Sequence, residues 1–171
     1  MPAMRSENDL KAVVESSKIV PFWLILDHIQ DPHNLGACLR TADAAGIQGV
    51  IVTKDQAVGI TPTVCKVASG AAETVPVYQV TNISRTIAWL KEQGIWVVGA
   101  AGEAEKTIYE TDINMPLALV MGAEEKGMRR LTREQCDFLV KIPMQGSVES
   151  LNVSAAAAVL IYEAFRQRLG A

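Results

Sequence analysis

Six short apolar runs, separated by helical patterns, constrain the fold of this chain more than any other feature of its sequence. Most of these runs are continuous rather than alternating, as in Leu117–Met121. Continuous apolar runs are typical of strands that are buried on both faces of a parallel sheet. The six predicted strands are Trp23–Asp27, Gly49–Val52, Val75–Val80, Trp96–Ala100, Leu117–Met121 and Phe138–Ile142. Strands that alternate with helices predict an α/β domain with a mostly parallel six-stranded sheet flanked by helices.

Helical patterns fill the stretches between the predicted strands. The first helix is expected to begin at Asp31 and Pro32, because Asp is a common N-cap and Pro is favoured at the first helical position. Gly46 stands where a helix-ending glycine belongs. Residues 7–16 are open to two interpretations, a short helix or a strap. The later helices are predicted at Thr63–Ala68, Ser84–Gln93, Leu131–Cys136 and about 151–169.

The composition excludes several classes of protein. A length of 171 residues predicts one domain. The three cysteines are far apart and odd in number, which favours buried thiols in a reducing compartment, and no cysteine–histidine cluster suggests a metal site. We find no signal peptide and no apolar run of about 18 residues, so we expect a soluble cytoplasmic protein without a membrane partner. With a net charge of −3, any nucleic-acid contact must come from a local patch or from a segment that this chain lacks.

Familiar nucleotide-binding and hydrolase motifs are missing from the sequence. No G-x-G-x-x-G follows the first predicted strand, and neither a Walker A sequence nor a G-x-S-x-G elbow occurs. Three polar segments remain, and each follows a predicted strand. In open α/β sheets, ligands bind beyond the carboxyl ends of the strands. These three segments are therefore the candidates for a functional site.

The first segment runs from Asp31 to Arg40. Its simplest interpretation is a capped helix start, but two side chains are less easily explained that way. Asn34 lies in the first turn beside free backbone N–H groups, and Arg40 lies on a stripe otherwise made of Leu and Ala. An arginine near a helix start gains nothing from the helix dipole, whereas its guanidinium suits a phosphate. A solvated surface arginine is the alternative for Arg40.

The second and third segments follow the last two predicted strands. In the second, Gly122 and Gly127 indicate close backbone approach or a positive φ, and Glu124 would project into a cleft; an ordinary charged turn is the alternative. In the third, we expect Ser147 or Ser150 to be an N-cap. Asn152, in the first helical turn, is less well explained by propensity. The Ala155–Ala158 face that follows is small enough for close packing.

These three segments, in this order, resemble the SpoU/TrmH family of RNA 2′-O-ribose methyltransferases, within the SPOUT superfamily. The resemblance covers residues 23–168. The sequences of its motifs are most similar to the branch that methylates a guanosine ribose in 23S ribosomal RNA. The matching motifs are Asp31-Pro32-x-Asn34-x-Gly36 with Arg40, Met121-Gly122-x-Glu124 with Gly127, and Ile142-Pro143-Met144 with Ser147 and Ser150-Leu151-Asn152-Val153-Ser154.

The resemblance implies a fold, a cofactor and partners. It implies a C-terminal trefoil knot that holds S-adenosyl-L-methionine (AdoMet) as the methyl donor, and a homodimer that acts on RNA, with ribosomal RNA as the leading candidate. Topology rules alone would not propose a knot, because knots are rare. The cofactor-binding residues carried over from the family are Ala100, Gly102, Gly122, Ile142, Met144 and Leu151.

The resemblance also implies roles for five catalytic residues, Asn34, Arg40, Glu124, Ser150 and Asn152. The family proposal makes the residue at Arg40 the base. A guanidinium normally stays protonated, so we expect Arg40 to hold the adjacent phosphate and stabilise a developing alkoxide. Ser150 and Asn152 would orient the ribose, and Asn34 would fix Arg40. Glu124 would accept from the ribose, from the cofactor or from Asn152.

The chain departs from the family at its N-terminus. We assign residues 1–20 to an extension or linker remnant and residues 21–171 to the methyltransferase domain, while the family's N-terminal RNA-recognition domain is absent. The chain would then be a catalytic domain of a longer protein or a natural minimal form. Two other functions stay open, namely methylation of a tRNA ribose and an inactive module that only binds RNA or AdoMet.

Overall fold

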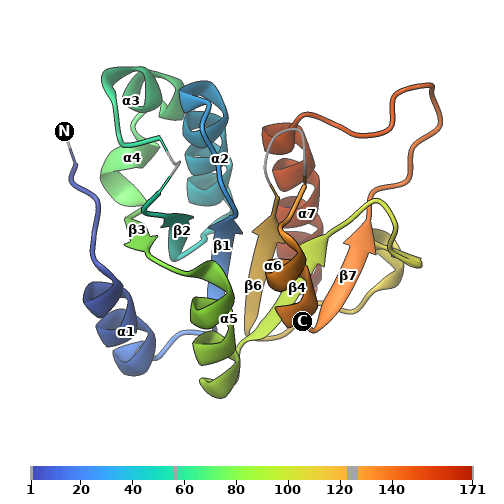
Figure 1. Ribbon diagram of the computed structural model, residues 1–171, viewed down its shortest axis with the longest axis horizontal. Coiled ribbons are helices and arrows are strands. Elements are labelled where there is room, and N and C mark those ends of the chain that lie inside the picture. The colour runs from blue at the N-terminus through green and yellow to red at the C-terminus, as the bar shows by residue number, and fades with distance from the viewer. Residues whose placement is uncertain (1, 56–57, 123–126, 171) are drawn as a thin grey trace.

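A computed structural model describes residues 2–55, 58–122 and 127–170, and its centre is a seven-stranded sheet (Figure 1). All strand pairs are parallel, and the strand order is β3-β2-β1-β6-β4-β7-β5. The strands are β1 (Phe22–Leu26), β2 (Gly49–Thr53), β3 (Val77–Val80), β4 (Trp96–Ala100), β5 (Lys106–Thr107), β6 (Leu117–Met121) and β7 (Phe138–Lys141). The predicted α/β class with a parallel sheet is therefore confirmed.

Helices cover both faces of this sheet (Figure 1). One face packs against α2, α3, α4 and α7, and the other against α1, α5 and the residues around α6. Along β1, Leu24 belongs to the first core and Ile25 to the second. Alternate side chains of a strand point to opposite faces, so both faces must be apolar, which explains the continuous runs. The helices are α1 (Glu7–Ser16), α2 (Pro32–Ala45), α3 (Pro62–Ala68), α4 (Ala71–Thr74), α5 (Ile83–Glu92), α6 (Arg130–Gln135) and α7 (Val153–Leu169), with a 3-10 turn at Ile108–Glu110.

Two short elements were missed by the sequence analysis, and one strand was predicted too long. The prediction of six strands was wrong because β5 has only two residues, Lys106 and Thr107, which form no apolar run. It lies at the sheet edge and pairs with β7. The short helix α4 was also missed. The third strand begins at Val77 rather than Val75, after Pro76, whose nitrogen carries no hydrogen to donate to a neighbouring strand.

The N-terminal residues are packed onto the sheet. Residues 7–16 form helix α1, which settles the choice between a helix and a strap. Its Leu10 is buried in the core with α5, and Arg5 bridges Tyr78 of β3 in parallel. Within the part of the chain that the structure describes, no helix is both long enough and apolar enough to cross a membrane.

The predicted caps of α2 are confirmed, whereas that of α7 is corrected. Asp31 accepts from the backbone N–H of His33 at 2.8 Å, and Gly46 ends α2 with a φ of 78°. Helix α7 is capped by Asn152, whose side chain accepts from the backbone N–H of Ser154 at 2.9 Å. The prediction that Ser147 or Ser150 caps this helix was therefore wrong, because α7 begins later than the pattern of apolar residues indicated.

One buried carboxylate fastens α7 to the loop before β6. Glu163 is only 7% exposed, and its oxygens accept from Arg166 Nε at 2.8 Å and from Gln167 Nε2 at 2.9 Å. Gln167 in turn donates to the carbonyl of Thr111 at 3.0 Å. The hydrogen bonds from Arg166, together with that from Gln167, outweigh burial and hold the pKa of Glu163 below its ordinary value of 4.5.

Replacing Glu163 with glutamine is expected to lower the unfolding free energy at neutral pH by about 1 kcal/mol, because charge-assisted hydrogen bonds become neutral ones. The pKa of Glu163 is depressed in the folded state, so its contribution is complete above the ordinary pKa of 4.5 and is lost as the pH falls through the lower folded value. Urea unfolding at a series of pH values checks this. Glu134→Gln, which removes one partner of an exposed ion pair, is the control, and an equal loss in the control would contradict the prediction.

Candidate functional site

A cavity of about 560 Å³ lies at the carboxyl ends of β4, β6 and β7. Its remaining wall comes from the long loop that joins β7 to α7 (Figure 1). Its lining residues are Ala100, Ala101, Gly102, Glu103, Met121, Gly122, Gly127, Met128, Arg133, Val140, Lys141, Ile142, Met144, Glu149, Ser150, Leu151, Val153 and Ala156. Three neighbouring strand ends and one loop thus form a single cavity of small-molecule size.

All six residues predicted to bind the cofactor line this cavity, although three separate stretches of the sequence supply them. Ala100 ends β4 and Gly102 follows it, while Gly122 follows β6 directly. Ile142, Met144 and Leu151 belong to the loop between β7 and α7. The strand order explains this convergence, because β4 pairs with both β6 and β7.

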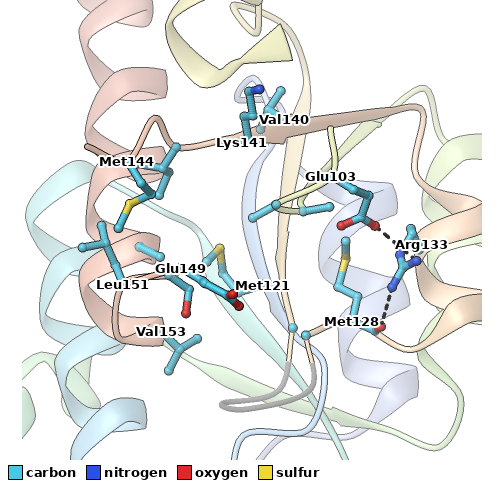
Figure 2. Close-up of a pocket in the computed structure, with 18 residues that line it drawn as sticks. Glu103, Met121, Met128, Arg133, Val140, Lys141, Met144, Glu149, Leu151 and Val153 are labelled. Carbon is cyan, nitrogen blue, oxygen red and sulfur yellow. Dashed lines mark hydrogen bonds and ion pairs between the residues drawn. The ribbon is translucent and has the colours of Figure 1, made fainter. Parts of the chain in front are cut away.

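The two ends of the cavity differ in chemistry (Figure 2). On one side, Met144 and Leu151 present apolar side chains from the loop before α7. On the other side, Arg133 of α6 forms an ion pair with Glu103, at 3.2 Å between Nη1 and Oε1. Such a cavity suits a ligand that has one flat apolar part and one charged part.

Arg133 has unused hydrogen-bonding capacity at the charged end of the cavity. Its Nη2 donates to the carbonyl of Met128 at 3.5 Å. Its Nε is buried and has no hydrogen-bond partner among residues 2–55, 58–122 and 127–170. A buried donor without a partner is costly, and an arginine presents its donors in a fork that matches a carboxylate. The Arg133 side chain as a whole is 42% exposed and lines the cavity, so its guanidinium can meet an anionic group of a bound ligand.

Gly122 allows two segments of backbone to touch at the wall of the cavity. A Cβ atom at this position would overlap the backbone nitrogen of Met128 and the carbonyl carbon of Gly127, and it would lie 2.7 Å from the Cα of Gly127. Gly127 itself has a φ of 71°. The prediction that these two glycines serve close approach and a positive φ is confirmed.

Cys136 is half-buried beside Gly99 and is poorly suited to act as a nucleophile. Burial, together with the nearby Asp137 carboxylate, raises the pKa of its thiol to about 12. Its Sγ donates to the carbonyl of Thr132 at 3.4 Å. The thiol therefore stays protonated at neutral pH, and covalent chemistry through Cys136 is disfavoured.

The predicted catalytic residues are not gathered in one place within a single chain. Ser150 lines the cavity, whereas Asn34, Arg40 and Asn152 lie outside its lining. Asn152 caps α7 and accepts from the Ser154 hydroxyl at 2.6 Å. The preference of asparagine for the N-cap position therefore explains why Asn occurs there. Glu124 lies outside the residues that the structure describes.

Arg40 occupies a different environment from the one expected. It lies in the second half of α2 and is exposed, whereas the neighbouring Leu39 is fully buried. Asn34 is buried near the start of the same helix. Six residues of helix rotate a side chain by about 240°, so the two residues point in different directions. Within the described ranges no hydrogen bond joins them, and the prediction that Asn34 fixes Arg40 does not hold inside one chain.

Several charged residues of the cavity were missed by the sequence analysis. Glu103 follows the predicted residue Gly102, and Glu149 precedes the predicted residue Ser150, but neither glutamate was itself predicted. Arg133 lies in the short helix α6, more than 25 residues along the chain from Glu103, so no local pattern joins them. The described residues contain no group of three His, Cys, Asp or Glu side chains that could hold a metal ion.

The sequence of this chain is similar to those of one protein family. The sequence matches the SpoU rRNA Methylase family over residues 21–162. It is 60% identical over 163 residues to the 23S rRNA (guanosine-2′-O-)-methyltransferase RlmB of Shewanella oneidensis, an alignment that covers 95% of this chain. The chain spans only 66% of the length of that relative.

Two solved structures share the fold. The SpoU methyltransferase AviRb from Streptomyces viridochromogenes, in complex with the cofactor AdoMet, superimposes with a TM-score of 0.86 and 30% identity over 99% of this chain and 63% of the other. The A. aeolicus TrmH/SpoU tRNA modifying enzyme gives a TM-score of 0.81 and 29% identity over 96% of this chain and 84% of the other.

Proposed function

Because this chain belongs to the SpoU rRNA methylase family, we propose that it transfers a methyl group from AdoMet to a ribose 2′-hydroxyl in RNA, with a guanosine of 23S ribosomal RNA as its substrate. The observation that carries this proposal is the cavity in which all six predicted cofactor residues meet. The relative from Shewanella oneidensis is a 23S rRNA (guanosine-2′-O-)-methyltransferase, which supports the choice of substrate. A ribosomal RNA substrate would also place the activity in the cytoplasm.

The residues of the cavity fit AdoMet chemically. Ile142, Met144 and Leu151 provide apolar contacts for the adenine ring. The Arg133–Glu103 pair offers opposite charges for the carboxylate and ammonium groups of the methionine part. When bound, AdoMet supplies a methyl group on a sulfonium, which is a good leaving group. We further propose that the loop between β7 and α7 is threaded as a trefoil knot around this site.

The side chains of the protein would then position the ribose and stabilise charge. Arg40 holds the adjacent phosphate and stabilises the oxyanion that develops on the 2′-oxygen as the hydroxyl proton passes to solvent. Ser150 lines the cavity and can orient the ribose hydroxyl. Asn152 and Glu124 assist in that orientation. Positioning of this kind supplies much of the rate enhancement in transfer reactions.

The exposed position of Arg40 favours a dimeric enzyme. In one chain Arg40 lies on the exposed side of α2, and it is not part of the cavity lining. Helix α2 packs beside α7, whose start borders the cavity. We propose that a second copy packs against these helices, so that the Arg40 of one protomer completes the site of its partner. A self-complementary surface of this kind is usual in symmetric dimers.

Methyl transfer from labelled AdoMet to transcripts of 23S ribosomal RNA and of tRNA tests the proposed function. Label is expected in the ribosomal transcript, at a ribose that becomes resistant to alkaline cleavage after its 2′-oxygen is methylated. The likeness to a tRNA modifying enzyme keeps tRNA as the second candidate. Label in tRNA alone would replace the proposed substrate, and AdoMet binding without any transfer would favour a non-catalytic binding module.

Leu151→Arg is expected to weaken AdoMet binding at least about tenfold, because a charge would have to be buried against an apolar ligand surface. Leu151 is 38% exposed and lines the cavity. Val148→Arg is the matched control, since Val148 lies in the same loop, is 64% exposed and is not among the lining residues. Isothermal titration calorimetry measures both variants. Equal affinities for the two variants would contradict the assignment of this cavity to AdoMet.

A further inference from the structure

A second cavity, of about 360 Å³, lies on the sheet face that carries α5 and α6. These two helices pack against one another, as Figure 1 shows. The cavity is bounded by the residues that follow β1, β2 and β3 and by the first residues of α5 and α6. It shares no lining residue with the first cavity. The site described above therefore leaves this polar cavity without a role.

A buried carboxylate forms one wall of the second cavity. Asp27 is 2% exposed and lines the cavity. Its Oδ1 accepts from His28 Nδ1 at 2.7 Å, and its Oδ2 accepts from the backbone N–H of Arg129 at 2.9 Å. His28 holds a φ of 69°, which is unfavourable for a residue with a side chain. The Asp27 carboxylate thus holds His28 and the backbone of Arg129 in place at the wall of the cavity.

The remaining charged residues of the cavity are one aspartate and two arginines. Asp55 is exposed at the end of β2, where the Thr53 hydroxyl donates to its backbone carbonyl at 2.9 Å. Its carboxylate can only accept hydrogen bonds. Arg129 and Arg130 are exposed at the start of α6 and both line the same cavity, where Nη1 of Arg130 also donates to Glu134 at 3.2 Å. A ligand that matches this lining has paired N–H donors on one part and an anionic group on another.

We propose that this second cavity binds a guanine nucleotide of the RNA substrate, separately from the AdoMet cavity. The inference rests on the proposed function for its RNA ligand. The Watson–Crick edge of guanine carries two adjacent donors, N1–H and the 2-amino group, which a carboxylate such as that of Asp55 accepts together. The nucleotide phosphate then meets the guanidinium groups of Arg129 and Arg130. Adenine has only one donor on that edge, beside an acceptor that a carboxylate repels.

One short segment, residues 127–132, borders both cavities, each with different residues. Gly127 and Met128 line the first cavity, and the next four residues line the second. The hydrogen bond between Asp27 and the backbone of Arg129 fixes this shared wall. An RNA nucleotide held in the second cavity would therefore lie beside the cofactor site, where it can help to position the chain that carries the target ribose.

Titration of the ¹⁵N-labelled protein with guanosine 5′-monophosphate (GMP), in the presence of AdoMet, tests the proposal by NMR. Amide resonances of Asn82, Ser84 and Arg130 are expected to shift, while those of Gly102 and Met144 stay in place. Adenosine 5′-monophosphate is expected to bind at least about fivefold more weakly, because its edge leaves the carboxylate without a pair of donors. Equal affinity for the two nucleotides, shifts confined to the first cavity, or no shifts would each overturn the proposal.

The variant Asp55→Asn is expected to reduce GMP affinity at least about fivefold, since its amide places a donor where guanine needs an acceptor. Asp112→Asn is the matched control, because Asp112 is also exposed and lies outside both cavities. For the RNA substrate, Asp55→Asn is expected to raise KM while the Kd for AdoMet stays unchanged. An identical effect in the control would overturn the proposal.

These experiments can contradict the proposed methyltransferase function and the proposed nucleotide site independently of one another. The GMP titration requires no catalysis, so shifts at the second cavity without any methyl transfer would count only against the proposed function. Methyl transfer to RNA by a protein that shows no GMP shifts would count only against the second cavity as a nucleotide site.

Discussion

Arg40→Ala is expected to lower the kcat for RNA methylation at least about hundredfold, the loss that follows removal of one charge-stabilising donor from an active site. Arg40 is exposed on α2, so the variant should fold normally. Arg40→Lys should recover only part of the rate, because a lysine ammonium lacks the planar fork that holds a phosphate with two hydrogen bonds. Methyl transfer from labelled AdoMet measures all three proteins.

Arg85→Ala is the matched control for this loss. Arg85 is also an exposed arginine in a helix, it lies outside both cavities, and its removal changes the net charge equally. An Arg40→Ala protein that turns over RNA as fast as the Arg85→Ala protein would remove Arg40 from the mechanism.

The same variant distinguishes a site within one chain from a site shared by two. If Arg40 acts on the cavity of its partner, mixing Arg40→Ala with Leu151→Arg gives mixed dimers in which one of the two sites is intact. Random exchange makes half of the dimers mixed, so about a quarter of the wild-type activity should return. No recovery after exchange of subunits would mean that Arg40 acts in its own chain or that the protein is not a dimer of this kind.

Gly122→Ala is expected to destabilise the fold by about 3 kcal/mol, at the upper end of the usual cost of overpacking, and to weaken AdoMet binding at least about tenfold. The added methyl group would overlap the backbone of Gly127 and Met128. Backbone atoms cannot rotate away as a flexible side chain can, so the wall of the cofactor cavity has to move. Urea unfolding and calorimetry with AdoMet measure the two effects.

Gly102→Ala provides the contrast for Gly122→Ala. Gly102 lines the same cavity, but a Cβ atom there meets nothing within 4 Å. Its substitution is expected to change the unfolding free energy by no more than about 0.5 kcal/mol. Similar stability of the two variants would show that the close contact at Gly122 is relieved without cost.

Most of the fold could be predicted from local patterns. Strands buried on both faces leave continuous apolar runs, so β4 and β6 were predicted with their observed bounds. Asp31, Pro32 and Gly46 mark the ends of α2 because capping depends only on adjacent residues. The edge strand β5 left no such signal, since it has two residues and no apolar side.

The residues of the candidate site also fall into those that could be predicted from the sequence and those that could not. Ala100, Gly122 and Ile142 stand at or directly after strand ends, which the sequence shows, whereas Met144 and Leu151 were predicted through the family resemblance. The charged end of the cavity was not visible, because Arg133 and Glu103 come from different elements. The cap at Asn152 was missed for a related reason, since the true start of α7 depends on how the loop leaves β7.

The sequence by itself therefore determined the class of the fold and the positions of its longer strands, and its resemblance to a known family predicted six of the residues that line the first cavity. Only the tertiary structure decided that β4 lies between β6 and β7, which brings Gly122, Ala100 and Ile142 to one cavity. It also decided the Arg133–Glu103 pair, the exposure of Arg40 and the second cavity beside Asp27. The physical reason is that apolar runs and caps are short-range signals, whereas strand order, burial and ion pairs arise from packing between segments that are far apart in the chain.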